Sequence, residues 1–332
     1  MSKSLKVLIT GAGTVACPSV IKGFRQQSEI QVHITAVGPN LQPAGRYLAD
    51  AFHAVPPASD TSFIPTLRDI VKHEGIQLLI PVVDDEFPVL AESREQFEHS
   101  GCRVAVSDPR IVALCREKDK TYGFFKQNGI PTMSSWVPAD LPYPGAVRYP
   151  VFVKPRTGKS SGGHKISNAQ EFYFWTERTH EPIYREFLEG EDHTVDVFSN
   201  FYGRAICAIA CVPTETNAAG ACPVRTVCDS KLTDASKFIA EKAGIVGPSN
   251  FRCIKTSAGL IFTEMNQGFS ENLPLVIAAG LNPLLLLAKC TLFEDVRGDG
   301  DDFEDGLVML RFWDEIFVSR SGEVRMDTGR RR

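Results

Sequence analysis

A lysine that closes an apolar strand, followed at once by a glycine- and serine-rich loop, is the clearest chemical feature of the sequence. In the segment from Tyr149 to Ile166, strand alternation places Phe152 and Lys154 on one face and Val151 and Val153 on the other. Glycines allow backbone amides to converge, and a cation beside converging amides suits phosphate groups. A β-hairpin with a solvated lysine at its mouth explains the same residues equally well. The loop consists of Gly158, Lys159, Ser160, Ser161, Gly162 and Gly163. 

A second chemical feature is an acid and an amide that alternate along a predicted strand. Glu264 and Asn266 are two residues apart, so their side chains project from the same face. Oxygen ligands on one rigid face suit Mg²⁺, which takes one or two protein oxygens and completes its shell with phosphate and water. An edge strand with polar residues turned outward is the alternative, and it is favoured unless this face meets the loop after Lys154.

Composition limits the classes of protein to which the chain can belong. Its 332 residues, 43% hydrophobic and 23% charged, predict a globular protein of two domains, or of one domain with a subdivided second half. A net charge of −4 argues against a nucleic-acid partner. The nine cysteines include no CxxC pair, which disfavours zinc and disulfides. The apolar stretch from Val7 to Ile9 is too short for a signal peptide or membrane span, so a cytoplasmic protein without a membrane partner is expected.

Alternating strands and helices predict a doubly wound parallel sheet in the first third of the chain. The apolar strand that starts at Lys6 runs into the glycine turn Gly11–Gly13, as at the start of a dinucleotide-binding unit. Ala16 occupies the third glycine position, and no acid follows the strand at 32–37 to hold a ribose. The turn is therefore predicted to be structural, with a nicotinamide-dependent enzyme as an alternative. Helices are expected at 63–74, 87–100 and 111–128, and further strands at 77–83 and 102–106.

The remaining two-thirds of the chain is predicted to be richer in strands. Asn168 is expected to cap a helix that runs to about Thr179, and a helix from Leu232 is expected to end before Gly244. The strongly apolar helix expected from Pro283 to Phe293 could belong to the core or to the interface of a homodimer. Strands are expected at 182–190, 192–198, 204–212, 250–255, 260–266 and 306–311.

Taken together and in this order, these segments resemble the ATP-grasp superfamily, and in particular the carbamoyl-phosphate synthase large subunit and its short stand-alone relatives. The likeness extends from Lys6 to about Val318. The loop after Lys154 is not a Walker A motif, because the first glycine of that motif would fall on Val153. The matching segments are Lys118–Lys120 with Gly129–Pro131 ("DK…GIP"), Pro150–Gly162 ("PVVVKP" and its loop), Tyr184–Asp196 ("QEyleGeEytvD"), Arg225–Val227 ("grtv"), Gly247–Asn250 ("GpxN") and Glu264–Asn266 ("ExN").

The resemblance implies an architecture and a set of roles. It implies a Rossmann-like pre-ATP-grasp domain at 1–117, and an ATP-grasp domain at 118–320 with a small lobe at 118–185 and a large lobe at 186–320, followed by a tail at 321–332. Lys120 and Lys154 would contact ATP phosphates, beneath the glycine-rich loop. The other implied positions are Glu186, Phe187 and Leu188 at the adenine, Asp192 at the ribose, Glu264 and Asn266 on Mg²⁺ or Mn²⁺, and Arg225 at the transferred phosphoryl group.

Three positions depart from the pattern of the family. Arg252 stands where relatives have a metal-binding glutamine or acid, and Gly268 stands where they have a phosphate-contacting arginine. Arg185 replaces the usual glutamine of the hinge. Because a cation at a metal position repels a second Mg²⁺, we interpret Arg252 as the residue that neutralises phosphate in place of the missing arginine, and we predict a catalytic role for it together with Arg225.

Such a site suits phosphoryl transfer from ATP to a carboxylate. The resemblance therefore predicts an ATP-dependent carboxylate–amine ligase, in which a small-molecule carboxylate becomes an acyl-phosphate that an amine attacks. No nucleophilic side chain is required, and no Cys–His or Ser–His signature stands out in the sequence. A nucleotide-binding ATP-grasp protein with weakened catalysis is the alternative, because of Arg252 and Gly268. Candidates for the substrate pocket are Asp85, Glu86, Ser270 and Glu271.

Overall fold

The first third of the chain forms a five-stranded sheet with helices on both faces. In the computed structural model, which describes residues 3–141, 147–158, 163–214, 223–293, 296, 302–312 and 315–326, the strand order is β3-β2-β1-β4-β5 and each pairing is parallel. The predicted doubly wound parallel sheet is confirmed. Its elements are β1 Lys3–Ile9, β2 Ile30–Gly38, β3 Ala51–Ala54, β4 Leu78–Ile80 and β5 Arg103–Val104, with α1 Ala16–Arg25, α2 Ala44–Leu48, α3 Phe63–Glu74, α4 Glu86–Glu92 and α5 Arg94–Glu98.

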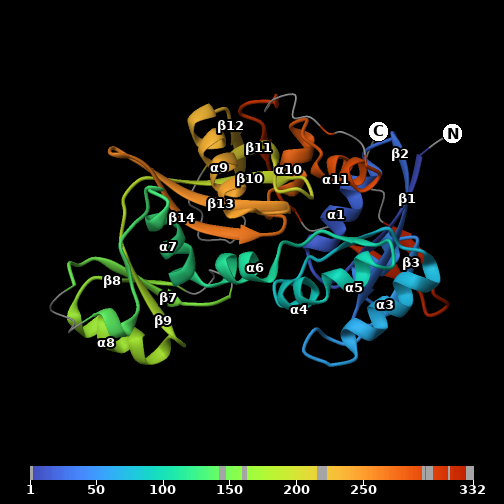
Figure 1. The fold of residues 1–332 in the computed structure, drawn as a ribbon, viewed down its shortest axis with the longest axis horizontal. Coiled ribbons are helices and arrows are strands. Elements are labelled where there is room, and N and C mark those ends of the chain that lie inside the picture. Colours follow the sequence, from blue (N-terminus) through green and yellow to red (C-terminus); the bar gives the residue numbers. More distant parts are fainter. Residues whose placement is uncertain are drawn as a thin grey trace.

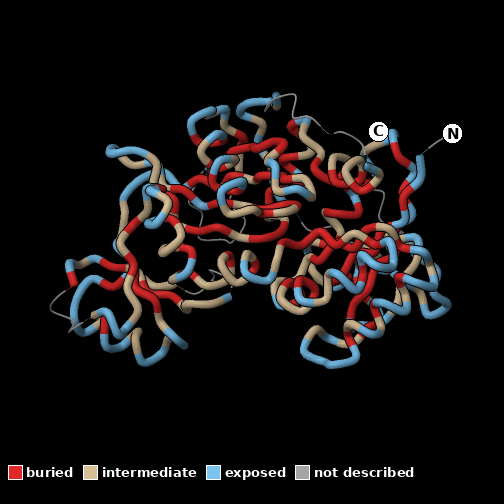
Figure 2. Tube along the Cα trace, viewed as in Figure 1, coloured by how far each residue is buried: buried red, intermediate tan, exposed pale blue. Residues whose placement is uncertain are grey.

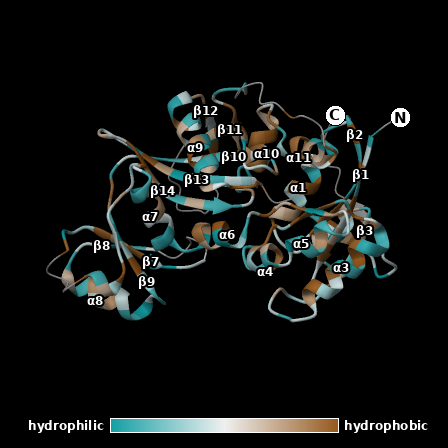
Figure 3. Ribbon diagram, viewed as in Figure 1, coloured by the Kyte–Doolittle hydropathy of each residue, from teal (hydrophilic) through white to brown (hydrophobic). Residues whose placement is uncertain are grey.

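The two faces of this sheet bury two separate hydrophobic cores. Along β1, Val7 and Ile9 face the core that contains Phe24 of α1, whereas Leu8 faces the core that contains Leu67 of α3. This alternation follows from the period of two along a strand. Figure 2 shows the buried residues concentrated along the strands, and Figure 3 shows the apolar residues gathered in the same places.

Two helices that the sequence predicts as continuous are each divided in the structure. The helix predicted at 87–100 is divided at Ser93 into α4 and α5, and α5 turns the fully buried Phe97 into the core. The helix predicted at 111–128 is divided at Glu117 into α6 Pro109–Arg116 and α7 Lys118–Gln127. Glu117 has extended backbone angles and pairs with Thr157 in an isolated β-bridge, so a long-range contact interrupts the local helical pattern.

A small antiparallel sheet follows, with the strand order β6-β9-β7-β8. One face is covered by α8, which begins after Asn168; the predicted cap is confirmed because the Asn168 side chain accepts a hydrogen bond from the Glu171 amide. We call this sheet and α8 the small lobe; in Figure 1 it lies at the opposite end of the molecule from the N-terminal domain. Its elements are β6 Ser135–Trp136, η1 Pro138–Asp140, β7 Val151–Pro155, β8 His164–Ile166, α8 Ala169–Arg178 and β9 Pro182–Glu186.

A six-stranded antiparallel sheet, the large lobe, has the order β14-β13-β10-β11-β12-β15. The strands predicted at 250–255 and 260–266 are confirmed as the hairpin of β13 and β14, and α9 covers one face of the sheet. A separate hairpin includes part of the predicted tail, since Val324–Met326 pairs with Ile316–Val318. The elements are β10 Glu191–Ser199, β11 Ala205–Pro213, β12 Val224–Val227, α9 Ser230–Ala243, β13 Gly247–Thr256, β14 Gly259–Gln267, β15 Val308–Met309, β16 Ile316–Val318 and β17 Val324–Met326.

Two late helices, α10 Leu273–Ala278 and α11 Pro283–Thr291, return to the N-terminal domain and pack against α1 (Figure 1). Leu284 enters the same core as Phe24, and a side chain at Gly23 would meet Ile277 Cδ1 at 2.7 Å. The Asn282 side chain also donates to the Gly23 carbonyl at 3.0 Å. These contacts fix the N-terminal domain against the large lobe.

Among the described residues, every helix is too short or too polar to cross a bilayer.

Candidate active site between the two lobes

Two cations project from the small lobe toward the large lobe. Arg185 on β9 pairs in register with Phe152 on β7, so Arg185 lies on the same sheet face as Phe152 and Lys154. The opposite face carries Val151 and the rest of the small-lobe core, as strand alternation predicted. Lys154 is 9% exposed and Arg185 is 3% exposed. Burial lowers the pKa of both side chains, so the uncharged form is less disfavoured here than in water.

The large lobe presents one carboxylate to these two cations. Glu264 on β14 accepts a hydrogen bond from Lys154 Nζ at 2.5 Å, and its Oε1 lies 3.5 Å from Arg185 Nη1. Arg185 Nη1 also donates to the Thr263 carbonyl at 3.1 Å. The sequence predicts a functional role for Glu264 and Asn266 only if their strand face meets the loop after Lys154. The contact between Glu264 and Lys154 brings this face to the start of that loop.

Asn266 lies beside Glu264 in a small pocket between the lobes. Its Nδ2 donates a hydrogen bond to Asn250 Oδ1 at 3.1 Å. The other side-chain atom, Oδ1 of Asn266, carries lone pairs that suit a cation. Two protein oxygens, supplemented by phosphate and water, match the preference of Mg²⁺. In the described part of the chain, no cluster of three or more His, Cys, Asp or Glu side chains offers an all-protein metal cage. The pocket is lined by Cys115, Arg116, Lys118, Thr121, Gly158, Arg185, Glu264, Met265 and Asn266.

The lysine of α7 that reaches this pocket is Lys118, not the predicted Lys120. Lys118 Nζ donates to the Gly158 carbonyl at 2.8 Å, and burial is the main cause that lowers its pKa to about 8. Nearby Lys154 and Arg185 lower it further, against the opposite effect of Glu264. Lys120 instead forms a 2.6 Å ion pair with Glu117 and is half exposed.

Helical geometry explains why Lys118 lines the pocket and Lys120 does not. Two residues along a helix are about 200° apart, so Lys118 and Lys120 cannot face the same pocket. Lys118, Thr121 and Phe125 are all buried and follow the spacing of one helical face. That spacing is visible in the sequence and would have selected Lys118 once the helix was divided at Glu117.

The ends of the glycine-rich loop show why glycine is required there. Gly158 has φ +81°, a conformation that disfavours other residues, and its carbonyl is the acceptor for Lys118. A Cβ on Gly163 would lie 2.0 Å from Phe152 Cε1, so the chain could not pass this close with any other residue. Lys159, Ser160, Ser161 and Gly162 lie outside the described residues.

The two arginines predicted to be catalytic are placed differently. Arg252 pairs in register with Glu264 and so shares its sheet face, but its Nη1 is in a half-exposed ion pair with Asp192 at 2.9 Å. Arg225 pairs with Val212, one residue beyond the Cys211 that pairs with Thr194. Because Thr194 shares the face of Arg252, Arg225 projects from the opposite face, the one that α9 covers. The prediction that Arg225 faces the reaction is therefore not supported.

The predicted adenine-binding segment begins at the end of β9, where the chain leaves the small lobe. The Glu186 amide donates to the Ser134 carbonyl at 2.9 Å, and the Ser134 amide donates to the Glu186 carboxylate at 3.3 Å. The ring of Phe187 lies under Lys165 Nζ, 4.0 Å from the ring centroid, and Leu188 follows it. Asp192, predicted at the ribose, is held by Arg252 as described.

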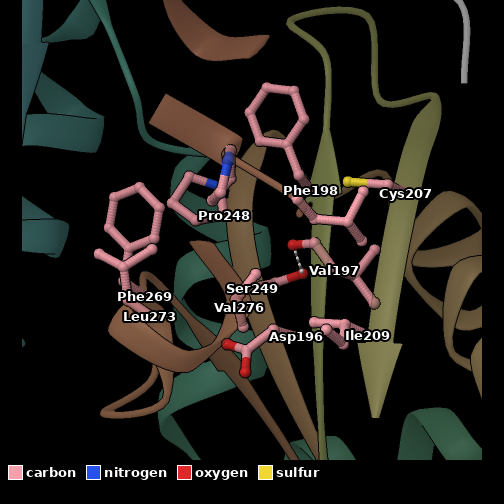
Figure 4. Close-up of a pocket in the computed structure, with 12 residues that line it drawn as sticks. Asp196, Val197, Phe198, Cys207, Ile209, Pro248, Ser249, Phe269, Leu273 and Val276 are labelled. Carbon is pink, nitrogen blue, oxygen red and sulfur yellow. Dashed lines mark hydrogen bonds between the residues drawn. The ribbon is translucent and has the colours of Figure 1, made fainter. Parts of the chain in front are cut away.

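A second recess lies on the face of the large-lobe sheet that carries Asn266, and it extends toward α10 and α11. Asp196 stands at one end of it and accepts a hydrogen bond from Ser270 Oγ at 2.7 Å; burial raises the pKa of Asp196 to about 6. Figure 4 shows mainly apolar side chains around this recess, with the Asp196 carboxylate at one edge. The other lining residues are Val197, Phe198, Cys207, Ile209, Pro248, Ser249, Phe269, Leu273, Val276, Leu281 and Pro283.

Two of the acidic residues suggested for the substrate pocket, Asp85 and Glu86, lie after β4 at the start of α4, and the third, Glu271, lies between β14 and α10. Asp85 forms a 3.0 Å ion pair with Arg116, which lines the interlobe pocket. Glu86 is buried and accepts a hydrogen bond from Thr10, and its burial raises its pKa to about 7. The Glu271 carbonyl accepts from Arg311.

Two sequence comparisons with known proteins match part of this chain. The model of the PylC-like N-terminal domain family matches residues 7–105. The vancomycin/teicoplanin A-type resistance protein VanA of Enterococcus faecium is 41% identical over 78 residues, a segment that spans 23% of this chain and only 23% of that protein.

Solved structures resemble the chain over nearly its full length at low sequence identity. The biotin carboxylase domain of Hydrogenobacter thermophilus 2-oxoglutarate carboxylase has a TM-score of 0.70 at 15% identity, covering 90% of this chain and 72% of that one. The N5-carboxyaminoimidazole ribonucleotide synthetase of Thermotoga maritima has a TM-score of 0.63 at 17% identity, with 92% and 79% coverage. The L-amino acid ligase of Bacillus licheniformis has a TM-score of 0.64 at 15% identity, with 89% and 77% coverage. This chain therefore has the fold that these enzymes share.

Proposed function

We propose that the protein is an ATP-dependent carboxylate–amine ligase that activates a small-molecule carboxylate as an acyl-phosphate with Mg-ATP. The observation that carries this proposal is the charge of the interlobe pocket. Lys118, Lys154 and Arg185 lie around the carboxylate of Glu264, which is the only acidic side chain among the described residues that line the pocket, while Arg252 is already balanced by Asp192. Buried cations in excess of their partners are costly unless an anion joins them. A nucleotide polyphosphate has the required charge.

Similar proteins support the choice of nucleotide and metal. The Hydrogenobacter thermophilus domain was solved with MgADP and bicarbonate. In this chain, Glu264 and Asn266 would hold Mg²⁺, which supplies charge neutralisation on the phosphate oxygens. Lys118 and Lys154 would bind the polyphosphate beside it. Mn²⁺ is an alternative metal for the same oxygens.

The chemistry follows from positioning and charge. A carboxylate oxygen of the substrate attacks the γ-phosphorus, the bond to the β-phosphate oxygen breaks and ADP leaves. The amine then attacks the acyl carbon and inorganic phosphate leaves, so that an amide-type bond forms. Lys118 and Lys154 stabilise the charge that develops on the phosphoryl oxygens, in a buried site where such contacts are stronger than in water. The chain supplies no covalent nucleophile in this scheme.

Lys118, rather than Lys120, should contribute to nucleotide affinity. Replacing Lys118 with methionine removes a buried cation from the pocket, so the affinity for Mg-ATP should fall by about 10- to 100-fold, the range for a charge-assisted hydrogen bond. Lys120→Met, two residues away on the same helix, should change affinity less than about twofold, because surface ion pairs contribute little. Calorimetric titration of both variants checks this. A larger loss in Lys120→Met would restore the assignment made from the sequence.

Nucleotide binding should take up a proton at alkaline pH. In the free protein the pKa of Lys118 is about 8, so at pH 8.5 the amine is largely neutral. A bound polyphosphate favours the ammonium form and raises that pKa, so the affinity for ATP should fall as the pH rises above 8 and be nearly constant below 7. Calorimetry at pH 8.5 in buffers of different ionisation enthalpy measures the proton directly. Wild type should take up on the order of half a proton or more, and Lys118→Met none; equal uptake by both would contradict this assignment.

The proposed reaction is tested by trapping the activated acid. The protein is incubated with Mg-ATP, hydroxylamine and a panel of small carboxylates that includes amino acids, and hydroxamate and ADP are measured together. Equal amounts of hydroxamate and ADP for one carboxylate would support the ligase. Tight Mg-ATP binding without hydroxamate or ADP for the whole panel would instead support the alternative, a nucleotide-binding protein with weakened catalysis.

A further inference from the structure

We propose that Arg185 binds the β- or γ-phosphate of the nucleotide, and that it is the arginine on which phosphoryl transfer in this chain depends. This inference rests on the proposed function, because it assigns a residue to the same site. In the sequence, Arg185 stands out only as a departure from the hinge pattern, and the motifs predict this role for Arg252 and Arg225.

The surroundings of Arg185 leave its charge poorly matched. Its side chain is 3% exposed, and its nearest carboxylate oxygen, Glu264 Oε1 at 3.5 Å, is bound more closely by Lys154 at 2.5 Å. Its Nη1 donates to the Thr263 carbonyl at 3.1 Å and, more weakly, to Glu264 Oε1 at 3.5 Å, whereas Nε has no hydrogen-bond partner among the described residues. A buried guanidinium with a donor left over is poised for an additional acceptor.

Other arginines near the site are occupied, or lie elsewhere. Arg252 is paired with Asp192, and Arg225 lies on the opposite face of its sheet. Arg116 lines the pocket but donates to the Asp84 carbonyl and pairs with Asp85. In the part of the chain that the structure describes, Arg185 is thus the buried arginine of this pocket whose donors are least used.

Gly268, the position at which the resemblance implies a phosphate-contacting arginine, cannot accept a side chain. Its φ of +98° lies in the region that favours glycine, and an added Cβ would approach Phe87 Cζ to 2.9 Å. Phe87 belongs to α4 and is part of the N-terminal core, so it cannot move aside easily. An arginine for this site must therefore come from another strand, and β9 provides it.

The chemistry of guanidinium explains what Arg185 would do. Its planar set of donors matches two phosphate oxygens at once, unlike the point charge of a lysine. Arg185 and Lys154 share the carboxylate of Glu264, which would hold the metal ion whose charge neutralises the terminal phosphates. Arg185 is therefore assigned to these phosphates and not to the α-phosphate.

The test compares nucleotides on wild type, Arg185→Gln and Arg185→Lys by calorimetry. Arg185→Gln should lower the affinity for Mg-ATP by about 10- to 100-fold but change the affinity for AMP, which lacks the β- and γ-phosphates, less than about twofold. Arg185→Lys keeps the charge without the planar fork, so it should show a smaller loss. Arg178→Gln, an exposed arginine on α8 of the same lobe, is the matched control and should behave as wild type.

The outcomes separate this inference from the proposed function. If wild type binds Mg-ATP and Arg185→Gln binds it equally well, Arg185 does not contact the phosphates. An equal loss of ATP and AMP affinity in Arg185→Gln would show that Arg185 only joins the lobes, and would also overturn the inference. If Arg185→Gln does not fold, as judged by its thermal transition, the ratio of ATP to AMP affinity in Arg185→Lys decides in the same way. Failure of wild type to bind Mg-ATP would overturn the proposed function, and the inference with it.

Discussion

Replacing Glu264 with glutamine should reduce Mg-ATP-dependent hydroxamate formation at least about 100-fold, the scale seen when one charge-stabilising group of a transition state is removed. Glu264 is the acid that lines the interlobe pocket in the described part of the chain, and the amide of glutamine is a much weaker ligand for Mg²⁺. The same change frees Lys154 and Arg185 from their carboxylate. Affinity for ATP without metal should therefore rise while turnover falls.

These two opposite effects distinguish a metal ligand from a residue that only supports the fold. Hydroxamate assays and calorimetry in EDTA measure them on the same preparation. Glu177→Gln, an exposed glutamate on α8, should leave both unchanged. Loss of metal-free ATP binding together with turnover in Glu264→Gln would show that Glu264 contributes through stability, and would remove it from the site.

Replacing Lys154 with methionine should lower the free energy of unfolding by about 3 kcal/mol, because the change leaves a buried carboxylate with a weaker partner. The Lys154 and Glu264 side chains are 11% and 7% exposed, so solvent screens their ion pair little. The double variant Lys154→Met/Glu264→Gln should be more stable than the sum of the two single changes predicts, because both charges are removed together. Urea unfolding of the four proteins measures this coupling energy.

Arg185 should reduce the coupling energy between Lys154→Met and Glu264→Gln without abolishing it. Its Nη1 stays 3.5 Å from Glu264 when Lys154 is lost, so part of the carboxylate charge is still compensated. Lys165→Met is a suitable control on the neighbouring strand β8, since Lys165 is exposed and contacts a ring rather than an acid. Additive effects of the two substitutions would mean that the ion pair contributes nothing to the stability of the free protein.

Local sequence patterns were sufficient for the features that depend on one strand or helix. Alternation placed Phe152 and Lys154 on one face of β7, and Glu264 with Asn266 in one pocket. Asn168 was recognised as a cap because capping is a contact within one turn of the chain. The same reasoning applied to α7 would have selected Lys118, if the break at Glu117 had been seen.

Other features depend on contacts between segments that are distant in the sequence. The break at Glu117 comes from its bridge to Thr157, and the role inferred for Arg185 comes from its approach to Glu264, 79 residues away. Neither contact leaves a periodic signal. Arg225 was placed by its motif alone, and only the register of β11 and β12 shows that it projects from the other face.

Calorimetric titration of wild type and Lys154→Met with Mg-ATP tests the central claim most directly. The account predicts micromolar binding to wild type and a loss of at least about 100-fold in the variant, because Lys154 is the buried cation held against the proposed metal ligand. Binding of equal strength to both proteins would contradict it, and would show that the nucleotide does not occupy the pocket between the two lobes.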